Sequence, residues 1–143
     1  MRRTFTSLAV FLALAGMVHA HAATKDPTVK AWMANMKDIG AETKTLGLMA
    51  RGQTSFDADA AAIALTRIEA MSRRIPSLFE TPADDPTSEA RDLIWTDWDG
   101  YRAEADALTR IAATAEVTNM DSLRQAVQTL GASCKSCHGT YRD

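Results

Sequence analysis

Residues 119–143 read NMDSLRQAVQTLGASCKSCHGTYRD. Within this stretch, apolar or thiol side chains recur at alternating spacings of four and three residues, which is the period of one face of an amphipathic α-helix. The side chains of this row are Leu123, Val127, Leu130, Cys134, Cys137 and Tyr141. Because both cysteines continue the apolar row, we expect them to point into the interior of a helical bundle.

Three earlier segments have the same helical period, and no segment alternates as a strand would. We expect helices over residues 27 or 28 to 50, 57–75 and 87 or 88 to 114, before the helix that begins after residues 119–121. The expected apolar row of the first helix runs through Val29, Met33, Met36, Gly40 and Thr43. Four helices joined by short connections predict an all-α fold, an antiparallel four-helix bundle.

Prolines and acidic residues mark the connection between the second and third helices. Pro76 is expected to stop the second helix, because proline lacks the backbone N–H that a helix interior needs. Further prolines indicate a surface connection after it. Within this connection and at the start of the third helix, Asp84, Asp85 and Glu89 are expected to be solvated.

The composition excludes several classes of protein. A chain of 143 residues with 24% charged and 46% hydrophobic side chains is expected to form one compact domain. Its net charge of −2 lacks the cationic excess of a protein that binds nucleic acid. Two cysteines and three histidines are too few for a scaffold of several disulfides or for a polyhistidine metal site.

Residues 1–22 are predicted to be a cleaved export signal. Arg2 and Arg3 precede an uncharged run over residues 8–18, which is too short to span a bilayer, and small residues suit signal peptidase at Ala20 and Ala22. We expect cleavage after Ala20 or Ala22, delivery to a bacterial periplasm by the general export route, and no stable membrane insertion. An uncleaved anchor and the twin-arginine route are the alternatives. The mature domain is then residues 23–143.

Removal of the export signal changes the numbers of charged and reactive side chains. The mature chain keeps 14 basic against 18 acidic residues and a single histidine, His138. This histidine directly follows Cys134-Lys135-Ser136-Cys137, so all thiols and the one imidazole fall within a Cys-x-x-Cys-His motif. The motif is the attachment signature of a c-type haem. Each thiol would form a thioether with a haem vinyl group, and His138 would offer a ring nitrogen to the iron.

Three other uses of this motif are disfavoured. A thioredoxin-type dithiol follows a strand at the start of a helix, whereas Cys134 lies deep in a helix. A structural zinc needs four ligands, and the mature chain has only three Cys and His residues. A disulfide between Cys134 and Cys137 would be strained on a regular helix. The export signal, by contrast, leads to the compartment in which c-type haems are attached.

The motif at the carboxyl end, followed by Tyr141 and Arg142 on the last of four helices, resembles class II cytochromes c, the cytochrome c' family. Further stretches similar to family landmarks are Met36-Lys37-Asp38, Gly40, Ala50-Arg51-Gly52, Phe56-Asp57, Pro76-Ser77-Leu78-Phe79 and Ile94-Trp95. The resemblance implies one covalent haem c per chain and an electron carrier rather than an enzyme. It also implies redox proteins as partners and a homodimer formed through the first two helices.

The resemblance leaves the ligand on the distal side of the iron open. Cytochromes c' proper keep this side vacant and take up nitric oxide or carbon monoxide, whereas their low-spin relatives bind a methionine of the first helix there. Met36 is at the position that resembles the ligating methionine, with Met33 one turn earlier as a second candidate. The leading expectation is therefore a carrier with His138 and Met36 as axial ligands. A five-coordinate module that binds a diatomic gas is the alternative.

Further expectations concern side chains around the motif. Arg142 is one turn beyond His138, and the resemblance implies that it contacts a haem propionate or the proximal side of the haem. Lys135 is expected to be an ordinary surface lysine, with a docking edge as the alternative. Aromatic side chains that we expect on the porphyrin or in the core are Trp32, Trp95, Trp98 and Tyr101.

Overall fold

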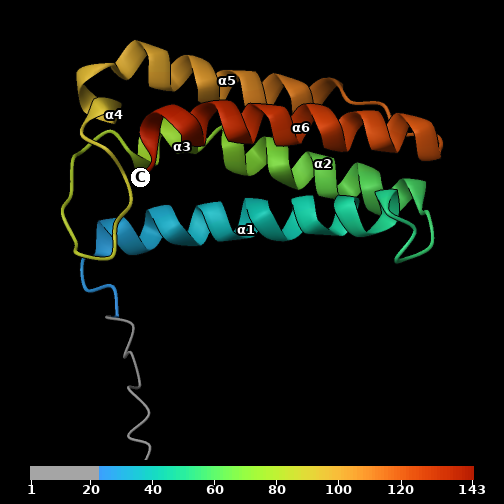
Figure 1. Ribbon diagram of the computed structural model, residues 1–143, viewed down its shortest axis with the longest axis horizontal. Coiled ribbons are helices and arrows are strands. Elements are labelled where there is room, and N and C mark those ends of the chain that lie inside the picture. Colours follow the sequence, from blue (N-terminus) through green and yellow to red (C-terminus); the bar gives the residue numbers. More distant parts are fainter. Residues whose placement is uncertain (1–22) are drawn as a thin grey trace, which may run out of the picture.

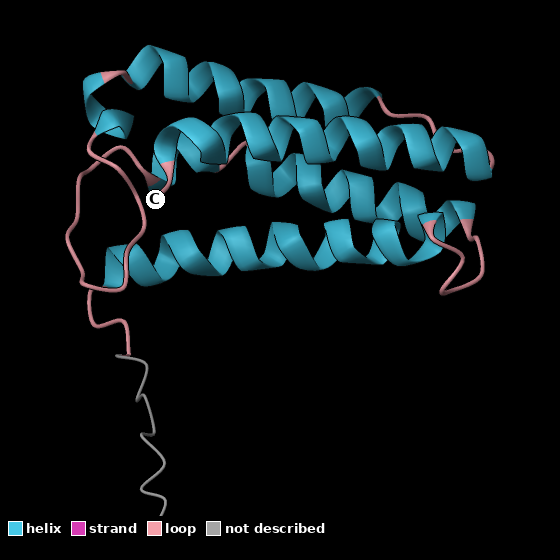
Figure 2. Ribbon diagram, in the orientation of Figure 1, coloured by secondary structure: helices cyan, strands magenta, loops and turns pink. Residues whose placement is uncertain are grey.

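The computed structural model describes residues 23–143, and the export signal predicted over residues 1–22 lies outside the described residues. Four long helices run side by side, with two short helices near one end of the bundle (Figure 1). In chain order the helices are α1 (Pro27–Ala50), α2 (Ala58–Ser72), α3 (Ile75–Leu78), α4 (Leu93–Thr96), α5 (Trp98–Thr114) and α6 (Met120–Tyr141). Loops join them, and residues 23–143 contain no strand (Figure 2).

The four long helices close into a bundle around one core. α1 packs on α2 and α6, and α5 packs on the same two helices. Fully buried side chains come from several helices, among them Leu46 of α1, Ile68 of α2 and Leu130 of α6. Among the helices of residues 23–143, none has the length and apolar character to cross a membrane. The predicted four-helix bundle is confirmed.

The first and last helices begin where their capping residues predict. The Asp26 carboxylate accepts hydrogen bonds from the N–H groups of Thr28 (2.7 Å) and Val29 (3.0 Å), and Pro27 follows in the first turn of α1. The side chain of Asn119 accepts from the N–H groups of residues 121 and 122 at the start of α6.

The second helix ends earlier than predicted. α2 stops at Ser72, and Pro76 lies in the first turn of the separate helix α3, where proline is tolerated because first-turn N–H groups have no partner inside the helix. The Ser72 hydroxyl donates to the carbonyl of Glu69 and accepts a hydrogen bond of 2.9 Å from the hydroxyl of Thr109 on α5. Ser72 and Thr109 are both buried, so this contact joins α2 to α5 inside the bundle.

The third helix begins later than predicted. Residues 87–92 are not helical, and the long helix starts only at Trp98, after the short helix α4. The N–H of Arg91 donates to the carbonyl of Tyr141 (3.0 Å), and the N–H of Asp143 donates to the carbonyl of Glu89 (2.9 Å). These partners at the far end of the chain replace the local bonds that a helix over residues 87–92 would have made.

The buried row of α1 differs from the predicted one by one residue at two positions. Trp32 and Ile39 are buried, whereas Met33 and Gly40, which were expected on that row, are exposed. Neighbouring residues differ by only about 100° around a helix, so the period alone does not choose between the two rows. The larger side chain of Trp32 gains more from burial and takes the inner position.

Gly100 on α5 lies where α5 and α6 approach closely. The Tyr141 hydroxyl donates a hydrogen bond of 2.6 Å to the Asp97 carboxylate directly beside it. A Cβ atom at Gly100 would stand 2.6 Å from the Tyr141 hydroxyl oxygen and would overlap Asp97 Oδ2. The missing side chain therefore makes room for the hydrogen bond that holds the end of α6 to the start of α5.

We expect Gly100→Ala to lower the free energy of unfolding by about 1–3 kcal/mol, because the new methyl group must displace the hydrogen-bonded pair. Urea unfolding followed by circular dichroism measures this loss. Gly131→Ala is the matched control, since Gly131 is also helical and nothing lies within 4 Å of its added Cβ. The control should have a free energy of unfolding up to about 1 kcal/mol higher than the wild type, because alanine has a higher helix propensity than glycine. An equal gain at Gly100 would contradict the close approach.

Candidate functional site

A cavity of about 550 Å³ lies between α1, the last turns of α6 and the loop before α4. Its floor consists of buried apolar and aromatic side chains, namely Val29, Trp32, Phe79, Ile94 and Tyr101. Its rim consists of exposed or half-buried polar side chains, namely Lys37, Thr87, Ser88, Glu89 and Arg142. This division suits a flat ligand that has an apolar body and a charged edge.

Most of the predicted site residues line this one cavity. Met36 contributes from α1, and Cys137, His138 and Arg142 contribute from the end of α6. Cys134 is outside the lining, one turn before Cys137 on α6, and packs against the buried core. The structure therefore brings together residues that are about a hundred positions apart in the sequence.

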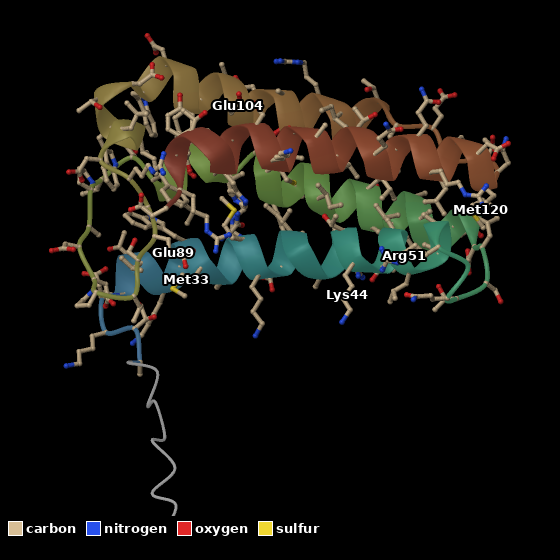
Figure 3. All side chains as sticks on the ribbon, viewed as in Figure 1. Met33, Lys44, Arg51, Glu89, Glu104 and Met120 are labelled. Carbon is tan, nitrogen blue, oxygen red and sulfur yellow. The ribbon has the colours of Figure 1, made fainter. Side chains whose placement is uncertain are left out.

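The two candidate methionines have different surroundings. Met33 and Met36 both line the cavity, but 47% of Met33 is exposed whereas Met36 packs against the core. The hydroxyl of Thr24 donates a hydrogen bond of 3.4 Å to the Met33 sulfur at the rim (Figure 3 labels Met33 and the neighbouring Glu89). Met36 is consequently the better placed thioether for a ligand inside the cavity.

Both cysteines are free thiols in half-buried positions. Burial raises the pKa of Cys134, and burial together with the nearby carboxylate of Glu104 raises the pKa of Cys137 to about 11. The thiols are therefore protonated at neutral pH in this structure. The neighbouring Ser136 donates a hydrogen bond of 2.9 Å to the same Glu104, which belongs to α5.

His138 is neutral at pH 7. Partial removal from water lowers the pKa of its imidazole below the ordinary value of 6.5, the guanidinium of Arg142 adds to this effect, and the carboxylate of Glu89 opposes it. A neutral imidazole has one ring nitrogen with a free electron pair, which is the form that binds a metal. His138 can thus serve as a metal ligand from the rim of the cavity.

The loop before α4 is fastened to the carboxyl terminus by a clasp, which we define as residues 89–91 paired with residues 141–143. Ala90 and Arg142 form an isolated antiparallel bridge. Ion pairs join Arg142 to Glu89 and, at 2.8 Å, Arg91 to Asp143. The clasp holds Arg142, which we expected beside the motif, against Glu89 at the cavity rim.

The aromatic floor is rigidly packed. Trp32 stacks on Phe79 with ring centroids 4.4 Å apart, and its indole N–H donates to the carbonyl of Leu78 at 2.5 Å. Tyr101 meets Tyr141 edge to face at 5.2 Å. Of the four aromatic residues singled out in the sequence, Trp32 and Tyr101 line the cavity, whereas Trp95 and Trp98 pack against the core around it.

Asp85 is buried, which corrects the expectation that it is solvated. Only 5% of it is exposed, and its carboxylate accepts hydrogen bonds from the N–H groups of Lys25 (2.7 Å) and Asp26 (2.9 Å). It also accepts from the N–H (2.9 Å) and hydroxyl (2.7 Å) of Thr87. These bonds, with the Asp26 N–H foremost, hold the pKa of Asp85 well below its usual range. Asp85 thus fastens the start of α1 to the loop that lines the cavity.

Sequence reasoning missed the loop residues 87–90 of the lining, because it assigned them to a helix. No local signal marks them, since the prolines at positions 82 and 86 disfavour helix only at the residue before each of them. Sequence reasoning also gave no role at the site to Lys37, which lines the cavity beside Met36. Asp84 and Glu89 are exposed, as predicted.

Comparison with known proteins gives consistent matches. A sequence model of the family described as Cytochrome C' matches residues 27–142. A cytochrome c-556 from Agrobacterium tumefaciens (strain apple 185) is 33% identical over 118 residues, which cover 80% of this chain and 94% of that protein. A cytochrome c' from Pararhodospirillum photometricum is 31% identical over 113 residues, or 76% of this chain and 90% of that protein. The structure of oxidized R. palustris cytochrome c556 matches with a TM-score of 0.75 at 25% identity, over 83% of this chain and 98% of that chain.

We expect Asp85→Asn to destabilise the protein at neutral pH and to flatten its loss of stability in acid. The folded pKa of Asp85 lies below its ordinary value of 3.8, so the carboxylate stabilises the fold fully above that value. This contribution disappears as the pH falls through the folded pKa. Thermal midpoints measured between about pH 7 and pH 2 should therefore converge for the variant and the wild type.

Asp84→Asn is the control for this experiment, because Asp84 is the exposed neighbour in the same loop. It removes the same charge from nearly the same place. We expect its thermal midpoint to follow the wild type at every pH. If Asp84→Asn and Asp85→Asn gave the same curve, net charge rather than the buried hydrogen bonds would explain the effect.

Proposed function

Because the chain belongs to the cytochrome c' family, we propose that it is an exported mono-haem electron carrier with His138 and Met36 as the axial ligands of its iron. The observation that carries this proposal is that Met36 from α1 and His138 from α6 line the same cavity. Thioether ligation opposite imidazole stabilises ferrous iron and leaves no open position for substrate chemistry. The chain therefore transfers electrons and is not an enzyme.

The residues of the cavity suit a covalently attached haem c. Cys134 and Cys137 offer protonated thiols on one helix face, and His138 offers a neutral imidazole one residue later. The apolar floor suits the body of a porphyrin, and the cationic Lys37 and Arg142 at the rim suit its carboxylates. One haem per chain accounts for the thiols, the imidazole and the cavity together.

The bound haem supplies a one-electron couple between ferric and ferrous iron, and the protein tunes that couple. Met36 would hold the iron from α1, and the floor around Trp32 and Phe79 would exclude water. The clasp holds Arg142 and Glu89 beside His138, where their opposite charges adjust the electrostatic potential at the proximal side. Larger redox proteins in the bacterial periplasm would supply and accept the electron, after the signal over residues 1–22 has been removed.

A five-coordinate module that binds nitric oxide or carbon monoxide is the second candidate function. Gly40 lines the cavity one turn beyond Met36 and brings no side chain to it. If Met36 only fills the cavity, a diatomic ligand would occupy the open position of the iron instead. Cytochromes c-556 and cytochromes c' both occur among the relatives, so the ligand on the distal side must be tested directly.

We expect Met36→Ala to convert low-spin ferric iron into high-spin iron and to increase the affinity of the ferrous protein for carbon monoxide about tenfold or more. In the wild type, carbon monoxide must displace the thioether. Its apparent affinity is therefore the intrinsic affinity multiplied by the small fraction of chains in which the position is open. Absorption and magnetic spectra of the ferric state, together with carbon monoxide titration of the ferrous state, measure both changes.

Met33→Ala is the matched control, because Met33 lines the same cavity one turn earlier. We expect it to keep the low-spin spectrum and the weak binding of carbon monoxide. A wild-type protein that is already high-spin and binds carbon monoxide as readily as Met36→Ala would favour the gas-binding function. A loss of the low-spin spectrum in Met33→Ala alone would assign ligation to Met33.

Covalent attachment predicts that haem stays with the chain after denaturing electrophoresis. The exported wild-type protein should stain for haem peroxidase activity on the gel, and the double variant Cys134→Ala/Cys137→Ala should not, because no thioether can form. Lys135→Ala, within the same motif, should stain like the wild type. A wild-type chain without stain would instead support a haem-free bundle that acts as an interaction module.

A further inference from the structure

The solvent face of α1 carries three lysines in one row. Lys30, Lys37 and Lys44 are spaced by seven residues, which is close to two full helical turns, so they point in nearly the same direction. All three are exposed (Figure 3 labels Lys44). The side chains between them on this face are also exposed, namely Met33, Ala34, Gly40 and Ala41. We call this surface the lysine row.

No acidic side chain of α1 lies within the lysine row. The acidic residues of this helix are Asp38 and Glu42, which lie on the flank toward α2. There Glu42 pairs with Arg67 of α2 at 3.0 Å. The row thus keeps its positive charge, although residues 23–143 carry 14 basic against 18 acidic side chains. Such a locally positive surface attracts acidic partners even though the net charge of the protein is negative.

The lysine row borders the cavity. Lys37 lines the cavity, and so does Met33, a large apolar side chain with 47% of its surface exposed. Glu89, the acidic residue of the rim, is paired with Arg142. A protein that docked on the row would therefore cover the cavity mouth and place its own redox group close to the site.

We propose that the lysine row is the docking surface for an acidic patch of a redox partner protein. The inference rests on the proposed function, because it names the surface through which the electron passes. Exposed lysines around a small apolar contact give fast, salt-sensitive association rather than tight binding. A second copy of this chain fits the surface poorly, since a symmetric contact would set lysine against lysine.

Oxidation of the reduced protein by small charged reagents tests the sign of the charge at the site. Hexacyanoferrate(III) is an anion that takes one electron and becomes hexacyanoferrate(II), while the iron of the protein goes from ferrous to ferric. Tris(phenanthroline)cobalt(III) is the cationic counterpart. Stopped-flow rates would be measured from about 0.01 M to about 0.3 M ionic strength, over which screening removes most long-range attraction.

For the wild type, we expect the rate with hexacyanoferrate(III) to fall with added salt, in spite of the negative net charge, and the rate with the cobalt complex to rise. The double variant Lys30→Glu/Lys44→Glu should react about tenfold more slowly with hexacyanoferrate(III) at low salt. Its rates should approach those of the wild type at high salt. Neither substituted lysine lines the cavity, so the spectrum of the iron serves as a check on the site itself.

The matched control is Arg102→Glu/Arg110→Glu, which changes the net charge equally on α5, at the opposite side of the bundle from α1 (Figure 1). We expect it to slow the reaction with hexacyanoferrate(III) less than about twofold at low salt. Equal slowing by both double variants would overturn the proposal, because net charge alone would then explain the rates. So would a wild-type rate with hexacyanoferrate(III) that rises with salt.

Two further outcomes separate this proposal from the function on which it rests. If Lys30→Glu/Lys44→Glu changes the oligomeric state in sedimentation and leaves the rates unchanged, the row is a contact between copies and the docking proposal is wrong. If the wild type fails to exchange electrons with either reagent at high salt, the proposed function itself is wrong. Normal electron exchange at high salt with no effect of the lysines overturns only the docking surface.

Discussion

The clasp between residues 89–91 and 141–143 is the constraint on which the cavity depends. Two main-chain hydrogen bonds and two ion pairs fix the last turn of α6 against the loop before α4. This turn follows Cys137 and carries His138, so the clasp sets their position relative to the loop that lines the cavity. Because the cavity lies between segments from opposite ends of the chain, it forms only when the bundle has closed.

The core around the cavity depends on small side chains elsewhere in the bundle. Buried alanines recur on α2 and α5, namely Ala61, Ala64, Ala105 and Ala112. Small side chains let these helices approach closely, but they bury little apolar surface in a domain of modest size. The aromatic floor formed by Trp32, Phe79 and Tyr101 concentrates apolar surface on the cavity instead. A porphyrin seated there would complete the hydrophobic core as well as carry the electron.

Much of the fold and the centre of the candidate site could be predicted, because their signals are local. Helical period and capping residues located α1 and α6, and the Cys-x-x-Cys-His motif located the end of the cavity. Features that depend on distant partners could not be predicted. The sequence around Asp85 does not show that the N–H groups of Lys25 and Asp26 donate to its carboxylate. Nor does the sequence around residues 87–92 show that main-chain bonds with Tyr141 and Asp143 replace the expected helix there.

The buried hydrogen bond between Ser72 and Thr109 also limits how the chain can misfold. The buried alanines of α2 and α5 offer few shape differences between one turn and the next, so they add little to the choice of alignment between these helices. A slip by one turn would break this bond and leave each hydroxyl only the carbonyl of its own helix, Glu69 for Ser72 and Ala105 for Thr109, at a cost of about 1 kcal/mol. The contact thereby favours one alignment of the two helices near the end of α2, from which the chain leads to the cavity floor.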